Sequence, residues 1–183
     1  MYAELGGPRA GAAVQGDLAR FAASLSPDDG LRSFVAVFTG PTPLTEPEFS
    51  GLLWKQLQQM HDIDCWEHAW DARVSPDPED DRFSYSIGGT AFFVVGLHAA
   101  SSRWARRFAW PTLVFNPHEQ FVAMRERGRY ERTRTLIRGR DTELQGYPNP
   151  VLRDHGGGSE ARQYAGDDVD DSWHCPLVVH GRR

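Results

Sequence analysis

Apolar positions recur along the chain with the two periods that distinguish helices from strands. The run 34–38 (FVAVF) is apolar and ends before Gly40-Pro41, a pattern typical of a buried strand. Thr45 and Glu48 then have the spacing of a helix capping box. Apolar residues follow at helical spacing at Phe49, Leu52, Leu53, Leu57 and Met60. The pattern predicts a strand followed by an amphipathic helix.

A second group of apolar segments predicts three more strands. Residues 82–87 (RFSYSI) alternate between apolar and polar side chains, and residues 90–97 (TAFFVVGL) are almost wholly apolar. Gly88-Gly89 lies between them and permits the positive φ angles of a tight hairpin turn. Residues 112–115 form another short apolar run. We expect a hairpin whose second strand lies inside the sheet, and one further strand.

Two helix starts follow these strands. Ser101-Ser102 are suited to cap a short helix, and Asn116-Pro117 to begin a long, arginine-rich one. Gly128 is expected to break or bend the long helix. Its apolar positions are Phe121, Met124, Ile137 and Leu144.

The two ends of the chain differ from its middle in amino-acid composition. Residues 1–30 are rich in Gly, Ala and Pro and predict a flexible arm with a short helix near residues 17–25. Beyond Gln145, glycines and prolines predict loops, and the tail 173–177 (WHCPL) is expected to dock back onto the domain. Residues 31–183 are therefore predicted to form a single α/β domain of mixed α+β type. It would have a small central mixed sheet of about four strands, about three main helices and a loop-rich C-terminal segment.

Composition agrees with one folded domain. The chain has 183 residues, of which 40% are hydrophobic and 25% charged. Its longest apolar run, 90–97, is far shorter than the roughly 20 residues that cross a bilayer, so we expect a soluble, cytoplasmic protein with no membrane partner. Cys65 and Cys175 are expected to be reduced thiols.

Positive charge is concentrated in one segment. The formal net charge is −5, Lys55 is the only lysine, and ten arginines lie between Arg103 and Arg140. Acidic residues interrupt these arginines, and no recognition motif is present, so nucleic acid is not an expected partner. The segment is either a solvated helix with ion pairs or a helix on which one or two arginines face a bound anion.

Three histidine- or cysteine-bearing segments could carry chemistry. On a continued helix His61, Cys65 and His68 would share one face, which suits zinc; ordinary structural roles are the alternative. His118 is expected in the first turn of a helix, where the dipole favours a neutral, ligating imidazole; otherwise it is a polar helix-start residue. Cys175 lies between an aromatic segment and a proline, as either a metal-binding thiolate or a buried thiol.

A fourth segment joins a strand end to a helix start. His98 ends the apolar run, and Arg103 follows the two serines. Free N–H groups and an arginine there would hold a carboxylate or phosphate. In the alternative interpretation Ser101 only caps its helix, and Arg106 and Arg107 face water.

Taken in order, these segments resemble the YqcI/YcgG family. The matching stretches are 82–121 (RFSYSIGGTAFFVVGLHAASSRWARRFAWPTLVFNPHEQF), 137–152 (IRGRDTELQGYPNPVL), 159–166 (SEARQYAG) and 173–177 (WHCPL), about half of the chain. The family often has Phe-Pro-Cys near its first strand, where this chain has Phe34-Val35-Ala36, so any role of that cysteine is absent. The family's Cys-Pro-Phe becomes Cys175-Pro176-Leu177, which keeps the cysteine and loses the aromatic ring.

The resemblance implies a haem-dependent N-oxygenase that uses haem b and O2 to hydroxylate a guanidine or amine nitrogen. Cys175 is the first choice of axial ligand because thiolate promotes O–O cleavage, with His98 or His118 as alternatives. Arg103, Arg106 and Arg107 are the choices for the propionates. His98, Ser102, His118 and Trp173 complete the expected cofactor-binding set.

A protonated guanidine or amine substrate would meet carboxylates or aromatic faces. Glu119, Glu160 and Asp71 are the candidate carboxylates, and Tyr164 and Trp173 the aromatic walls. No flavin- or nicotinamide-binding segment is visible, so electrons are expected from an external donor of the ferredoxin or reductase type.

Two other functions are compatible with the sequence. A non-catalytic haem-binding or sensing domain would bind the same cofactor and form no product, and a zinc-dependent hydrolase would use His61, Cys65 and His68. A homodimer is also considered, with Trp54 and Trp110 as candidate surface aromatics.

Overall fold

The computed structural model describes most of the chain. The described residues are 1–26, 30–126, 128, 130–147, 158–167, 169–170 and 172–181. In chain order the elements are α1 (Pro8–Ala23), β1 (Phe34–Val37), α2 (Glu46–Asp64), β2 (Tyr85–Ile87), β3 (Thr90–Leu97), the 3-10 helix η1 (Trp104–Arg106), β4 (Thr112–Pro117), α3 (His118–Glu126), α4 (Tyr130–Gln145) and α5 (Ala161–Tyr164). Among these residues no helix combines the length and the apolarity needed to cross a membrane.

The four strands form one sheet in the order β1-β4-β3-β2. Gly88 and Gly89, with φ angles of 62° and 69°, form the predicted tight turn between β2 and β3. The predicted α/β class with a four-stranded sheet is confirmed. Every pairing between these strands is antiparallel, whereas the sequence predicted a mixed sheet.

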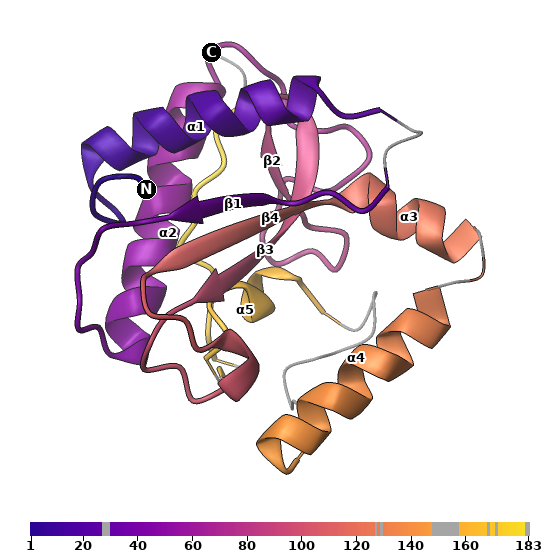
Figure 1. Cartoon of the computed structure of the whole chain (residues 1–183). Helices are drawn as coiled ribbons and strands as arrows, with labels where there is room; N and C mark the ends of the chain where they lie inside the picture. The colour runs from indigo at the N-terminus through magenta and orange to yellow at the C-terminus, as the bar shows by residue number, and fades with distance from the viewer. Residues whose placement is uncertain are drawn as a thin grey trace.

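Helices α1 and α2 lie side by side against one face of the sheet (Figure 1). Phe92 and Phe115 of the sheet are buried beneath them, together with Phe49 and Leu53 of α2. A Cβ atom on Gly96 would lie 2.7 Å from the Phe49 ring, so β3 needs a glycine where α2 approaches most closely. The burial of each such aromatic or leucine side chain contributes about 1.5–3 kcal/mol.

Residues 1–26 differ from the loose arm that the sequence predicted. Helix α1 has sixteen residues, and Ala10, Val14 and Leu18 are buried in the core. The glycine- and alanine-rich composition has a structural reason, because a Cβ atom on Gly11 would come within 3.0 Å of Gln59 on α2. Small side chains let these two helices pack closely, and α1 is part of the domain.

The segment after β3 forms only the short helix η1, where a serine-capped helix was predicted. Its backbone donors bond to side chains of distant elements. Ser102 N donates to Glu46 Oε1 (2.8 Å), and Trp104 N donates to Gln145 Oε1 (2.9 Å). These contacts join the segment to the start of α2 and the end of α4.

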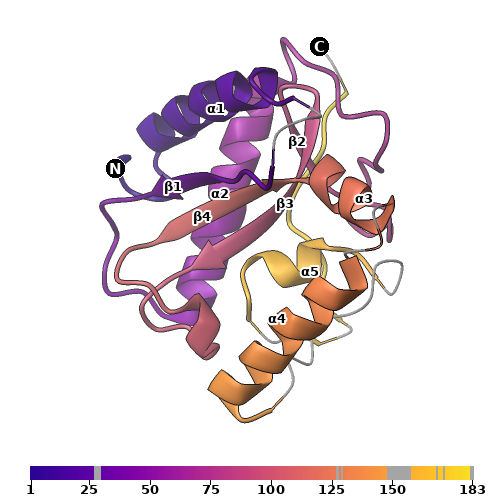
Figure 2. The same cartoon turned by 45° about the vertical axis from the view of Figure 1, so that its right-hand side comes forward.

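The arginine-rich segment is interrupted at Gly128, as predicted. Its φ of 66° suits a glycine between the end of α3 and the start of α4. Neither helix has a buried residue. Figure 2 shows α4 extending beyond the sheet.

The C-terminal tail docks onto α2, as the sequence predicted. Leu177 is buried, Val178 N donates to Gln58 Oε1 (2.8 Å), and His180 N donates to His61 Nε2 (2.8 Å). Cys65 and Cys175 are both free thiols.

Candidate functional site

A cavity of about 230 Å³ lies where α3 and α4 face β3 and the start of α5. Its lining residues come from four parts of the chain and are Phe93, His118, Phe121, Met124, Arg125, Tyr130, Thr133, Arg134, Ile137, Arg138, Gly158, Glu160 and Gln163. The cavity therefore lies at the end of the sheet where β4 passes into α3.

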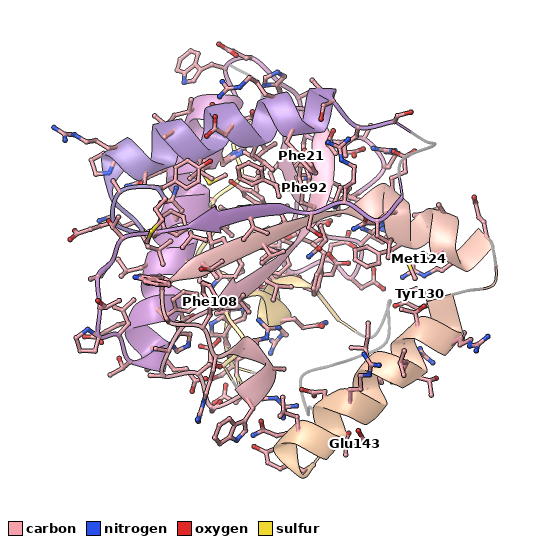
Figure 3. The ribbon with its side chains drawn as sticks, viewed as in Figure 1. Phe21, Phe92, Phe108, Met124, Tyr130 and Glu143 are labelled. Atoms are coloured by element: carbon pink, nitrogen blue, oxygen red, sulfur yellow. The ribbon has the colours of Figure 1, made fainter. Side chains whose placement is uncertain are left out.

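The walls of the cavity are aromatic and aliphatic. Phe93 of β3 and Phe121 of α3 meet edge to face, with ring centroids 6.3 Å apart. Met124 and Tyr130 face each other where α3 gives way to α4 (Figure 3). Ile137 adds a side chain that is 58% exposed, a large fraction for an isoleucine in a folded domain. These surfaces suit a flat, apolar ligand.

His118 and Glu160 form a polar pair at the cavity wall. His118 is the first residue of α3, and Glu160 immediately precedes α5. Nδ1 of His118 lies 3.9 Å from Oε1 of Glu160, and both side chains are largely buried. Burial raises the pKa of Glu160 to about 7, so this carboxyl group changes charge near neutrality.

Three arginines also line the cavity. Arg125 lies over the Tyr130 ring at 4.4 Å from its centroid, and Arg134 forms an ion pair with Glu131. Arg138 lies one turn of α4 further along. Glu160 is the single acidic residue among the described lining residues, so the lining carries an excess of positive charge.

Two of the three predicted catalytic residues lie outside this lining. The Tyr164 hydroxyl accepts a hydrogen bond from Tyr85 N (3.1 Å) and donates one to Phe92 O (3.3 Å), which joins β2 to β3. Its burial raises its pKa well above the ordinary value. Glu119 has a 64% exposed side chain that pairs with Arg73 at 3.2 Å. Of the predicted catalytic set, the structure brings only Glu160 to the cavity.

The arginines predicted to hold the propionates have other partners. The Arg106 guanidinium donates to the carbonyl oxygens of Gly96, Gln163 and Tyr164, and burial lowers its pKa to about 10. Arg107 donates to Ser101 O at 2.7 Å. Arg103 is bonded to Asp141 of α4. The three guanidinium groups tie loops and helices together and do not converge on one ligand.

Ser102 and Asp71 are also engaged within the chain. The Ser102 hydroxyl donates to Glu46 Oε1 at 2.8 Å, so the chain's own carboxylate occupies the expected anion position. Asp71 accepts hydrogen bonds from the side chain of Arg73 and from Ala91 N (3.0 Å). Neither residue lines the cavity.

His98 lies on the other face of the sheet, against α2. Its ring stacks on Phe49 with centroids 4.4 Å apart. Both ring nitrogens are buried and have no hydrogen-bond partner among the described residues, and burial lowers the pKa of the imidazole. His98 and His118 are therefore separated by the sheet.

Cys175 and Trp173 belong to the docked tail and do not line the cavity. Trp173 packs against Trp54 at 5.9 Å between ring centroids, and Trp54 is itself buried, which removes it as a candidate for a dimer surface. Burial raises the pKa of the Cys175 thiol to about 12, so it is a neutral thiol at pH 7.

The residues of the suggested zinc site point to different partners. Helix α2 ends at Asp64, with Cys65 as its C-cap. His61 Nε2 accepts from His180 N, and His68 Nδ1 lies 3.0 Å from Asp64 Oδ1. Within the part of the chain that the structure describes, no three His, Cys, Asp or Glu residues are grouped to hold a metal ion.

The YqcI/YcgG family model matches residues 1–178, nearly the whole chain. The chain belongs to the YqcI/YcgG family. The match covers α1 as well as the sheet and the cavity. Searches of curated proteins and of solved structures found no match.

Sequence reasoning identified His118 and Glu160 in this YqcI/YcgG protein but missed Arg125, Arg134 and Arg138. The apolar residues of the long segment were the available signal for this part of the site. They lie on helices that contain too many arginines to be buried in the core. Three of these apolar residues, Phe121, Met124 and Ile137, line the cavity.

Proposed function

We propose that this YqcI/YcgG protein binds haem b in the cavity between α3 and α4. With O2, it would hydroxylate a nitrogen of a small cationic amino-acid-like substrate. The observation that carries the proposal is the position of His118, an imidazole at the wall of a cavity with aromatic sides and a cationic lining. The reaction type and the substrate class come from the family resemblance.

The cavity residues fit the chemical needs of haem b. The macrocycle needs apolar walls, which Phe93, Phe121 and Ile137 supply. Its two propionates need cationic partners, and arginines give bidentate hydrogen bonds to carboxylates. The porphyrin provides four nitrogen donors, so the protein needs to add only one axial ligand.

His118 replaces Cys175 as the first choice for that ligand. Cys175 lies outside the cavity lining, and its burial favours the neutral thiol over the ligating thiolate. His98 faces α2 across the sheet. Among the described residues, His118 alone combines a ligating nitrogen with a place at the cavity wall.

Glu160 has two tasks in this proposal. Its carboxylate lies 3.9 Å from Nδ1 of His118, and a small shift of either side chain would form the hydrogen bond by which carboxylates orient ligating histidines and increase the basicity of the other ring nitrogen. As the acidic residue of a cationic lining, it also supplies the negative charge that an ammonium or guanidinium substrate needs.

The bound haem would supply the activation of O2, and the chain's own residues hold the cofactor and the substrate. The overall reaction consumes O2, two electrons and two protons and yields the N-hydroxy product and water. The electrons come from an external one-electron donor of the ferredoxin type.

A haemin titration of purified wild-type protein and two variants tests the cofactor. We expect a saturable Soret band for the wild type and for His174→Ala, whose side chain is 79% exposed, and a loss of at least about tenfold in affinity for His118→Ala. Equal haemin affinity in all three proteins would contradict the assignment of His118.

Product formation tests the oxygenase step separately. The loaded protein is supplied with O2, a ferredoxin with its reductase, and arginine or lysine, and N-hydroxylated product is measured by mass spectrometry. We expect product in the wild type and less of it in Glu160→Gln. Haem binding with no product from any guanidine or amine tested would favour a non-catalytic haem protein.

A further inference from the structure

Helix α4 forms one wall of the cavity without being part of the core. The described lining residues on α4 follow its helical period and are Tyr130, Thr133, Arg134, Ile137 and Arg138. None of the residues of α4 is buried. Among the described elements, α4 contacts chiefly α3 and η1. Most helices in folded domains are held by a buried apolar face, and α4 lacks one.

The joint between α3 and α4 has the freedom to turn. Gly128 lies between the two helices with a φ of 66°, a conformation that glycine adopts readily. A Cβ atom at this position would meet no heavy atom of the described residues within 4 Å, so the glycine serves the backbone and not packing. Figure 3 shows Met124 and Tyr130 at this joint and Glu143 at the far end of α4. A rotation at Gly128 would therefore move the far end of the helix most.

The far end of α4 is attached to the η1 segment by an ion pair and two hydrogen bonds. Arg103 immediately precedes η1 and pairs with Asp141, and both side chains are largely buried. Gln145 accepts a hydrogen bond from Trp104 N (2.9 Å) and donates one from Nε2 to Ser102 O (3.2 Å). We call these three contacts the latch. The latch fixes the end of α4 that lies furthest from Gly128.

The closed latch leaves part of Arg103 without a partner. Nε and Nη1 of this buried guanidinium have no hydrogen-bond partner among the described residues. Opening would expose both donors to water, which offsets part of the cost of separating Arg103 from Asp141. Buried ion pairs contribute little net stability when their hydrogen bonds are incomplete. The latch is therefore suited to open and close.

The volume of the closed cavity gives a reason for α4 to move. The cavity encloses about 230 Å³, whereas sites for drug-sized ligands commonly enclose about 300–1,000 Å³. Haem b is one of the larger ligands of this kind. Outward movement of α4 would enlarge the cavity and leave the core intact, because no residue of α4 is buried.

We propose that α4 is a lid that turns at Gly128, and that the latch controls entry to the cavity. The choice of haem as the ligand rests on the proposed function, whereas the movement rests on how α4 is held. Arg134 and Arg138 travel with α4, so they line the cavity only when the lid is closed. A ligand favours the state in which it makes more contacts, so an anionic ligand favours closure.

A distance measurement tests the movement without any ligand. Spin labels are attached at Glu143→Cys on α4 and at Arg20→Cys on α1, both exposed positions, in a chain whose native cysteines are replaced by serine. Pulsed electron paramagnetic resonance should show a minor second distance, and Asp141→Asn should increase its population at least about threefold. Arg140→Gln is the matched control, because Arg140 is an exposed residue of α4 outside the latch; it should leave both populations unchanged.

The rates of haemin exchange test the lid on the proposed cofactor. Stopped-flow absorbance measures association, and transfer to an excess of a haem-scavenging apoglobin measures dissociation. Asp141→Asn and Gln145→Ala should each raise both rate constants at least about fivefold, because α4 opens for haemin to enter and to leave. Loss of an ordinary contact with haemin would raise the dissociation rate alone. Arg140→Gln should keep both wild-type rates.

Two results would overturn the proposal. One is a single distance that neither Asp141→Asn nor Gln145→Ala changes, which would show that α4 is fixed. The other is a pair of folded latch variants in which only haemin dissociation is faster. A wild type that takes up no haemin would contradict the proposed function instead, and the distance measurement would then decide the lid.

Discussion

Nδ1 of His118 lies 3.9 Å from Oε1 of Glu160, and this pair joins the first turn of α3 to the start of α5. The two residues are 42 positions apart in the sequence and meet because β4 and the segment before α5 end at the same side of the sheet. The pair gives an otherwise apolar and cationic cavity its titratable carboxyl group.

Binding of a cationic ligand is expected to depend on pH through Glu160. Its pKa of about 7 means that the carboxyl group gains negative charge as the pH rises through neutrality. The affinity of haem-loaded protein for arginine should therefore increase between about pH 6 and about pH 8, and Glu160→Gln should remove most of that increase. Calorimetric titration at each pH measures the affinity for arginine. Glu119→Gln is the control, because Glu119 is exposed; equal loss in both variants would contradict the role of Glu160.

The same carboxyl group makes folding stability depend on pH with a defined sign. The pKa of Glu160 is raised from 4.5 to about 7 by burial, so the unfolded chain releases this proton first as the pH rises. As the pH rises from about 4.5 to about 7, this group therefore lowers the free energy of unfolding by up to about 3 kcal/mol. In urea unfolding experiments across this pH range, the free energy of unfolding should decline less in Glu160→Gln than in the wild type. An unchanged pH profile in that variant would argue against the raised pKa.

Tyr164 is expected to act in the fold and not in the cavity. In Tyr164→Phe the buried Tyr85 N–H loses its acceptor, which should lower the free energy of unfolding by about 1–3 kcal/mol. Haemin affinity should stay within about twofold of the wild type. Tyr147→Phe, at an exposed tyrosine, should change stability by less than about 0.5 kcal/mol. A large loss of haemin affinity in well-folded Tyr164→Phe would show that Tyr164 takes part in haem binding.

His98 is expected to limit stability in acid. Burial lowers its pKa below the ordinary 6.5, so the unfolded chain takes up this proton first as the pH falls. The free energy of unfolding of the wild type should therefore decline below about pH 6.5, and that of His98→Leu should decline less. At pH 7 the variant should be up to about 1 kcal/mol more stable, because it removes two buried nitrogens without partners. A loss of more than about 2 kcal/mol, or of haemin binding, would contradict this account.

The sequence predicted those parts of the fold that depend on neighbouring residues. The Thr45–Glu48 capping box forms with both of its hydrogen bonds, and Gly88-Gly89 makes the hairpin turn, because both are local devices. The break at Gly128 was predicted for the same kind of reason. The docking of the tail on α2 is a long-range contact, and the sequence predicted that the tail docks but not where. Helix α1 was missed because its small residues serve contact with α2, which is visible only when the two helices are packed.

The candidate site was only partly predictable because its partners are distant in the chain. His118 and Glu160 were selected individually, and no local pattern indicates that they meet. Arg106 looked like a free cation at a helix start, yet its guanidinium bonds to carbonyl oxygens 57 and 58 positions away. Glu46 likewise fills the anion position at Ser102 from the start of α2.

The central claim is that His118 is the axial ligand of a haem held in the cavity between α3 and α4. The most direct measurement is the absorption spectrum of the ferrous carbon monoxide complex of haemin-loaded wild type, compared with His118→Ala and Cys175→Ala. We predict the spectrum typical of histidine-ligated haem, kept in Cys175→Ala and lost in His118→Ala. A spectrum typical of thiolate ligation that disappears in Cys175→Ala, or a wild-type protein that takes up no haemin, would contradict the account.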